Sequence, residues 1–200
     1  MKNWFLEVGL VLLISALPSI STAQTAIVDY YANNTGPGSA VDQTLRLINV
    51  GQLGTPMTSP AGDICANLYV FDTNEAMIAC CSCRMPPNAL ASASVGHELT
   101  NHPLTSVIPS AGLIKILPII AGTVPCSPIA PFASPNASLV KAFSTHVQVS
   151  GPATYITETA LPPVRLSSEG AAFLSNTCLF LQYLAGSEGK GTCGCTTPGR

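Results

Sequence analysis

Charge is what this sequence has least of. Only 9% of its 200 residues are Asp, Glu, Lys or Arg, against about 25% in typical globular domains. Lys and Arg number 8, Asp and Glu number 10, and no basic run or patch occurs. Proteins that bind nucleic acid or anionic membranes do so through clustered Lys and Arg, so the composition argues against both partners. The surface must be covered by uncharged polar residues, Gly and Pro, which suits an extracellular protein.

Long apolar runs are also missing, except at the start of the chain. Lys2 precedes an apolar stretch over residues 8–17, and Pro18 and small residues follow up to Ala23. This order is typical of a secretory signal peptide. The stretch is roughly half of the ~20 residues that a membrane-spanning helix needs. We therefore predict a signal peptide over residues 1–23, cleaved after Ala23 or a few residues later. The mature protein would be secreted, extracellular or periplasmic, with no membrane span.

Cysteine is what the sequence does have. An even number of cysteines behind an export signal predicts four disulfides, with no thiol left for a metal. The disulfide candidates are Cys65, Cys80, Cys81, Cys83, Cys126, Cys178, Cys193 and Cys195.

The spacing of the cysteines restricts their pairing. Residues 64–71 and 76–83 are β-prone and flank the turn residues 72–75, so they predict a hairpin that sets Cys65 opposite position 82. A one-residue shift of register would pair Cys65 with Cys81 or Cys83. Neighbouring residues of a strand point to opposite faces, so Cys80 lies apart from the Cys81 and Cys83 side chains. The remaining members of this cluster are expected to bond Cys126, Cys178 or the Cys193 and Cys195 pair.

The remaining residues predict a mainly β protein. Residues 24–42 are polar and predict a flexible N-terminal leader, and residues 43–200 predict one domain. Its further strands are expected over residues 44–50, 92–95, 105–108 and 113–120. Residues 121–135 form a Pro/Ala-rich loop that Cys126 would tether.

A second hairpin has the clearest alternation of side chains. Residues 141–149 and 153–159 flank the turn at residues 150–152, and this spacing would set Val147 against Tyr155. Phe143, Thr145, Val147 and Val149 would share one face. Ser144, His146, Gln148 and Glu158 would lie on the opposite, solvated face.

A helix is expected near the C-terminus. Ser167 or Ser168 can cap it, it would run to about Leu184, and Gly186 lies where a C-terminal cap belongs. Its buried stripe would be Ala171, Leu174, Cys178 and Leu181. The fold class predicted from these elements is a single β-sandwich-like domain with one C-terminal α-helix, stapled by disulfides.

Catalytic motifs are incomplete. Ser138 and Lys141 match the S-x-x-K pair of penicillin-recognising enzymes, but the partner motifs S-D-N and K-T-G are absent. Two zinc-binding histidines on a helix stand four residues apart, whereas His97 and His102 stand five apart, so a loop metal site with His146 would be needed. No G-x-S-x-G nucleophile elbow occurs.

The sequence also lacks complete motifs for carboxylate catalysis, phosphate binding and metal binding. Asp63, Asp72 and Glu158 are scattered carboxylates without a pairing motif. Residues 189–192 (GKGT) resemble part of a phosphate loop but lack the Ser or Thr directly after Lys190. The CCSC and CGC clusters could together bind Cu(I) or zinc as thiolates, but export favours disulfides. We predict no cofactor, no metal site and no catalytic residues.

Four segments resemble a group of exported bacterial cysteine-rich proteins with no known activity. They are residues 64–72 (ICANLYVFD), 80–83 (CCSC), 157–159 (TET) and 191–195 (GTCGC). The resemblance spans roughly residues 42–195. It implies bacterial export and a recurrent cysteine framework, and it assigns no catalytic residue.

Three hypotheses about function follow. The first is a non-catalytic extracellular structural, adhesive or binding protein with a cell-surface or extracellular protein as partner. The second is a secreted hydrolase, with His146 or His97 beside a buried carboxylate or hydroxyl. The third is a soft-metal-binding protein with Cys and His ligands and free thiols.

Overall fold

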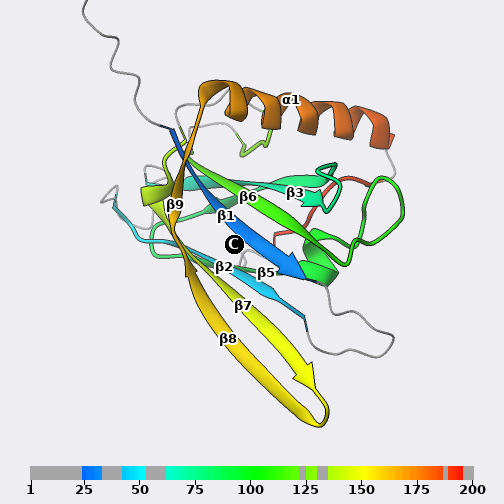
Figure 1. Cartoon of the computed structure of the whole chain (residues 1–200). Helices are drawn as coiled ribbons and strands as arrows, with labels where there is room; N and C mark the ends of the chain where they lie inside the picture. Colours follow the sequence, from blue (N-terminus) through cyan, green and yellow to red (C-terminus); the bar gives the residue numbers. More distant parts are fainter. Residues whose placement is uncertain are drawn as a thin grey trace, which may run out of the picture.

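Two antiparallel sheets and one helix make up the computed structural model (Figure 1). It describes residues 24–32, 42–52, 62–121, 125–129, 135–186 and 189–195. The predicted signal peptide and its cleavage site at Ala23 lie outside these residues.

The first sheet has the order β4-β3-β6-β1-β9, and the second has the order β5-β2-β7-β8. The strands of the first sheet are β1 (Gln24–Ala32), β3 (Ile64–Asp72), β4 (Met77–Met85), β6 (Ala111–Ile120) and β9 (Pro163–Leu166). Those of the second are β2 (Thr44–Asn49), β5 (Leu90–Ser94), β7 (Val140–Ser150) and β8 (Ala153–Leu161). A π-helix, η1 (Val95–Leu99), follows β5, and a 3-10 turn, η2 (Ala137–Leu139), precedes β7.

Apolar side chains fill the space between the sheets. Leu68 and Ile116 of the first sheet and Leu45 and Leu47 of the second belong to one buried cluster. A second cluster lies on the other face of the first sheet, where α1 (Ser168–Ala185) covers it (Figure 1). The layers are therefore helix, sheet and sheet, which confirms the predicted β-sandwich-like fold with one C-terminal helix.

The predicted helix is confirmed in its caps and in its buried stripe. Ser167 is the N-cap, and its side chain accepts a hydrogen bond from the backbone N–H of Gly170. Gly186 is the C-cap. The buried residues include all four predicted ones, Ala171, Leu174, Cys178 and Leu181. The outer face of α1 is apolar as well, with Phe173, Leu179, Phe180, Tyr183 and Leu184 exposed.

The prediction of a flexible leader over residues 24–42 is wrong for residues 24–32. These residues form β1, which pairs with β6 on one side and β9 on the other. Ile27 and Tyr31 are fully buried in the core. Polar residues such as Asp29 gave this segment the composition of a leader, but here Asp29 is buried too because it has hydrogen-bond partners inside the protein. The strand over residues 44–50 is thus the second strand.

The hairpin of β7 and β8 has a different register from the predicted one. Ser150 pairs with Ala153 across a two-residue loop, so Val147 faces Ile156 where Tyr155 was expected. The predicted faces are also wrong, because Ser144 is fully buried and Val149 is exposed. The short strand expected over residues 105–108 is absent, since this described segment is a turn followed by irregular chain.

Candidate functional site

The C-terminal tail closes one side of the sandwich. We call residues 189–195 the strap. Its Cys193 and Cys195 bond Cys81 and Cys83, which share one face of β4, as predicted. Gly191 accepts a backbone hydrogen bond from Cys80 (3.0 Å) and donates one to His102 (2.7 Å). The strap therefore covers the edge of β4 and also contacts the segment that follows β5.

The two remaining disulfides lie on the outer face of the first sheet. Cys80 bonds Cys178 and so fixes α1 to β4. Cys65 bonds Cys126, which confirms the tether of the Pro/Ala-rich loop but contradicts the predicted bond to Cys81 or Cys83. The reason is the register, because Cys65 pairs with Arg84 and a bulge lies between Val70 and Phe71. Residues opposite one another share a face, so Cys65 and Cys83 point to opposite faces.

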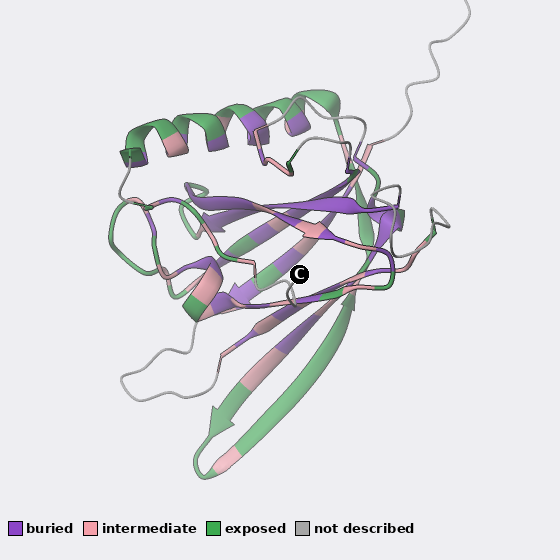
Figure 2. Ribbon diagram, turned by 180° about the vertical axis from the view of Figure 1, so that it is seen from behind, coloured by how far each residue is buried: buried purple, intermediate pink, exposed green. Residues whose placement is uncertain are grey.

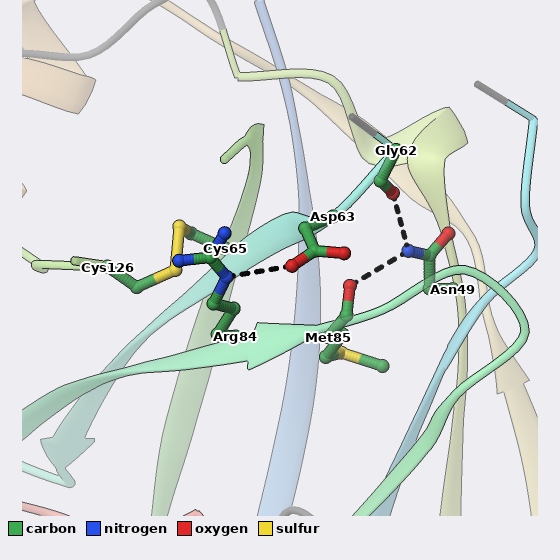
Figure 3. Close-up of polar contacts among 7 residues, drawn as sticks. All are labelled: Asn49, Gly62, Asp63, Cys65, Arg84, Met85 and Cys126. Carbon is green, nitrogen blue, oxygen red and sulfur yellow. Dashed lines mark hydrogen bonds and ion pairs between the residues drawn. A yellow bond between two sulfur atoms is a disulfide. The ribbon is translucent and has the colours of Figure 1, made fainter. Parts of the chain in front are cut away.

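Polar contacts beside the Cys65–Cys126 bond tie the ends of three strands together (Figure 3). Arg84 Nε donates to Asp63 Oδ2 at 2.8 Å, and Asp63 is buried. Asn49 Nδ2 donates to the carbonyls of Gly62 (3.0 Å) and Met85 (2.9 Å). Asp63, a candidate carboxylate from the sequence, is therefore in an ion pair with Arg84. These contacts hold the start of β3, the end of β4 and the end of β2 in place.

A buried polar cluster joins the two sheets on the other side of the sandwich. Asp29 of β1 and Ser144 of β7 are 1% and 0% exposed. The Gln43 side chain lies between them, and its Nε2 donates to Ser144 Oγ (2.8 Å) and Asp29 Oδ2 (3.3 Å). Gln43 Oε1 also accepts from the backbone N–H of Ala32 at 3.1 Å. Sequence reasoning missed this cluster because its members are far apart in the chain and match no motif.

His146, which the hydrolase hypothesis named together with His97, acts electrostatically on this cluster. Burial raises the pKa of the Asp29 carboxyl, and a hydrogen bond from Ser144, the charge of His146 and a hydrogen bond from Gln43 partly offset that rise. His146 therefore lies within electrostatic reach of a buried carboxylate.

The connections in this cluster are not those of nucleophilic catalysis. In a catalytic triad the serine hydroxyl bonds the histidine, which bonds the acid. Here the Ser144 side chain bonds Asp29 and Gln43. Ser144 is also inaccessible to a substrate. The cluster can hold the two sheets together, and it lacks an exposed nucleophile.

The other predicted residues do not gather into a site. Ser138 lies exposed in η2 and Lys141 lies exposed at the start of β7. Among the described residues, the only group of three or more metal-ligating side chains is Cys81, Cys83 and Cys195, so His97, His102 and His146 do not form one. All eight cysteines are in disulfides.

The remaining candidates have structural roles. Asp72 accepts backbone hydrogen bonds from Asn74 and Ala76 in the turn between β3 and β4. Thr192, from the GKGT segment, forms a β-bridge with Cys80. Glu158 lies 3.8 Å from Arg46 on the surface of the second sheet.

A surface cleft of about 370 Å³ lies along the N-terminal half of α1. The lining residues are Gln24, Ile129, Ser168, Ala171, Ala172, Ser175 and Asn176. None of them is an acid, a base or a thiol, so the cleft has polar groups for hydrogen bonding and none for acid–base or nucleophilic chemistry.

The last candidate is the free edge of the second sheet. Within the described chain β8 pairs only with β7, and its side chains from Thr154 to Ala160 are exposed on both faces. Figures 1 and 2 show that this hairpin extends beyond the body of the two sheets and is mostly exposed.

No helix in the described part of the chain has both the length and the hydropathy for a membrane crossing. Comparison with protein-family models, with curated proteins and with solved structures gives no match to this chain.

Proposed function

We propose that the chain is a non-catalytic extracellular structural protein that binds other polypeptides through the free edge of β8. The observation that supports this is the long unprotected edge of the second sheet. An exposed sheet edge offers a row of backbone N–H and C=O groups, and adding a strand to such an edge is a common mode of peptide recognition.

The other three sheet edges are short or covered. The strap covers β4, and β5 is only 5 residues long. β9 has 4 residues, starts at Pro163 and carries Arg165. Proline, charge, bulges and short length are the means by which proteins block pairing at an edge.

β8 has little of this protection, because Glu158 is its one charged residue. It is 9 residues long, contains no Pro, Lys or Arg, and pairs with β7 without a bulge. β-branched residues are common in it, with Thr154, Ile156, Thr157 and Thr159. Such a strand is suited to pair on its second side. The exposed aromatic face of α1 supports the same class of function, since large exposed apolar patches mark binding surfaces.

The contacts of the Asp29 cluster favour this function over a secreted hydrolase. The disulfides likewise favour it over a soft-metal-binding protein, because a disulfide sulfur is not the thiolate ligand that Cu(I) or zinc requires. Export, predicted from the sequence, is the context in which such disulfides persist.

The test uses cells that make and export the full chain. Mild non-reducing extracts are separated by size, and the wild-type protein should run in an assembly larger than the monomer. Ile156→Pro removes a backbone N–H of β8 and should shift the protein to monomer size. Proline is tolerated in an edge strand where its missing N–H would face solvent.

The matched control is Val149→Pro in the other strand of the same hairpin. Val149 pairs with Thr154, lies beyond the end of β2 and is exposed. This variant should run with the wild type. A wild-type protein that runs only as a monomer would contradict the proposed function.

A further inference from the structure

We infer that the strand that pairs with β8 is β8 of a second copy of this chain, antiparallel to the first and related to it by a two-fold axis at Thr157. This inference rests on the proposed function of β8. It goes beyond that function by naming the partner, the register and the symmetry.

The hairpin loop determines which backbone groups face the free edge. Gly151 has φ +60°, and Pro152 follows it, as in a type II′ turn with glycine at the first central position. In such a turn the flanking residues, Ser150 and Ala153, are joined by the closing hydrogen bond. Because bonded and non-bonded pairs alternate along an antiparallel ladder, the odd-numbered residues of β8 bond β7. Thr154, Ile156, Glu158 and Ala160 then direct their N–H and C=O groups to the free edge.

When two copies of β8 pair antiparallel, only one register pairs every residue of one strand with a residue of the other. Residues opposite one another in an antiparallel pair must be of the same bonding type, so the axis passes through a residue. Of the positions in β8, only Thr157 is the centre of Ala153–Leu161. In that register Ile156 faces Glu158 of the second copy in a hydrogen-bonded pair, and Thr157 faces Thr157 in a non-bonded pair. An axis at any other residue leaves part of each strand unpaired.

The position of the charged side chain in β8 is compatible with this register. Glu158 is the one charged residue of β8, and like charges directly opposite each other destabilise a sheet. With the axis at Thr157, each Glu158 stands opposite Ile156, and its carboxylate is near Arg46 of its own chain at 3.8 Å. With the axis at Glu158, the two carboxylates would face each other.

Symmetry also favours a second copy over an unrelated strand. In a two-fold symmetric dimer the free edges of both copies are paired at the same time, and the two four-stranded sheets become one continuous sheet. The hairpin extends away from the body of the molecule, so its free edge is accessible along its length (Figure 1).

The first experiment uses the purified, oxidised full chain with Thr157→Cys. The two introduced thiols would belong to a non-bonded pair with Cα atoms about 4.5 Å apart, within reach of a disulfide. Mild oxidation should give a covalent dimer on a non-reducing gel, and mass spectrometry should find the two peptides that carry the substitution linked to each other. Thr159→Cys is the matched control, on the same face of the same strand. In the proposed register position 159 faces Tyr155 of the second copy, so this variant should remain uncrosslinked.

The second experiment adds no thiol. Ile156→Glu sets a carboxylate opposite Glu158 of the second copy, whereas Ile156→Lys sets an ammonium there. Ile156 is 69% exposed, so neither change affects the core. By sedimentation, the dimer dissociation constant of the Glu variant should exceed that of the Lys variant by roughly tenfold.

The outcomes separate this inference from the proposed function. Equal crosslinking of the two Cys variants, or equal association of the Glu and Lys variants, would overturn the register. A purified wild-type chain that stays monomeric, while Ile156→Pro still abolishes the assembly in cell extracts, would overturn the second copy as partner and leave the proposed function standing. If the purified chain stays monomeric and Ile156→Pro also leaves the assembly in cell extracts unchanged, both the second copy as partner and the proposed function are overturned.

Discussion

The two sides of the sandwich are held together in different ways. On the side of β4 and β5, the strap crosses the edge of the first sheet with two disulfides and backbone hydrogen bonds. On the side of β1, β7 and β8, the sheets are joined by the hydrogen bonds of Asp29, Gln43 and Ser144. On the first side the strap covers the edge of β4, and β5 offers only a short edge. The second leaves the long edge of β8 unpaired in the described chain, and this is the edge that we propose binds another strand.

Loss of a disulfide should have the largest effect on stability, and the first case is the bond at the end of the strap. Cys83→Ala with Cys195→Ala removes a bond that spans 112 residues, and loss of a native disulfide costs about 2–5 kcal/mol. We expect urea unfolding to show a decrease in the free energy of unfolding in that range. We also expect faster amide exchange at Cys80, whose N–H donates to Gly191 of the strap.

The control for the strap is Cys65→Ala with Cys126→Ala, which removes a disulfide spanning 61 residues on the outer face. It should be destabilised by a similar amount, because loop-closure entropy changes slowly with length, but Cys80 exchange in the folded state should not change. Equal exchange at Cys80 in the two variants would show that the strap does not protect β4.

A smaller effect is expected from the polar side of the sandwich. Burial raises the pKa of Asp29, so the folded protein binds more protons than the unfolded one above the ordinary Asp pKa of about 3.9. Stability from this group is therefore present at low pH and is lost as the pH rises through the raised pKa. Asp29→Asn removes that dependence. Relative to the wild type, the variant should gain stability between pH 4 and pH 7 by urea unfolding.

Glu75→Gln controls for the loss of one negative charge, since Glu75 is exposed in the turn between β3 and β4. Its pH profile should run parallel to that of the wild type. An Asp29→Asn profile that also runs parallel would mean that Asp29 does not titrate differently in the folded and unfolded states.

The sequence allowed the local features of this fold to be predicted. The hairpin of β3 and β4, the shared face of Cys81 and Cys83, and the caps and stripe of α1 follow from turn residues and periodicity within short windows. The partner of Cys65 did not follow, because one bulge near Phe71 changes the face that Cys65 shares with β4.

The candidate sites were harder to predict for the same reason. Asp29 and Ser144 look like solvated residues in a sequence, and only the packing of β1 against β7 brings them together. Their hydrogen bonds depend on Gln43, which is 101 residues from Ser144. The free edge of β8 also follows from strand order, which local patterns do not specify.

The most direct test of the contrast between the two edges is amide hydrogen exchange as a function of protein concentration. Paired strand amides exchange slowly, and the amides of Ile156 and Glu158 have a partner only when a second strand lies on β8. We predict that their protection increases with concentration and is lost on dilution, whereas the Cys80 amide, bonded to the strap, keeps the same protection throughout. Protection of Ile156 and Glu158 that is the same at every concentration, or a Cys80 amide that exchanges as fast as theirs on dilution, would contradict this account.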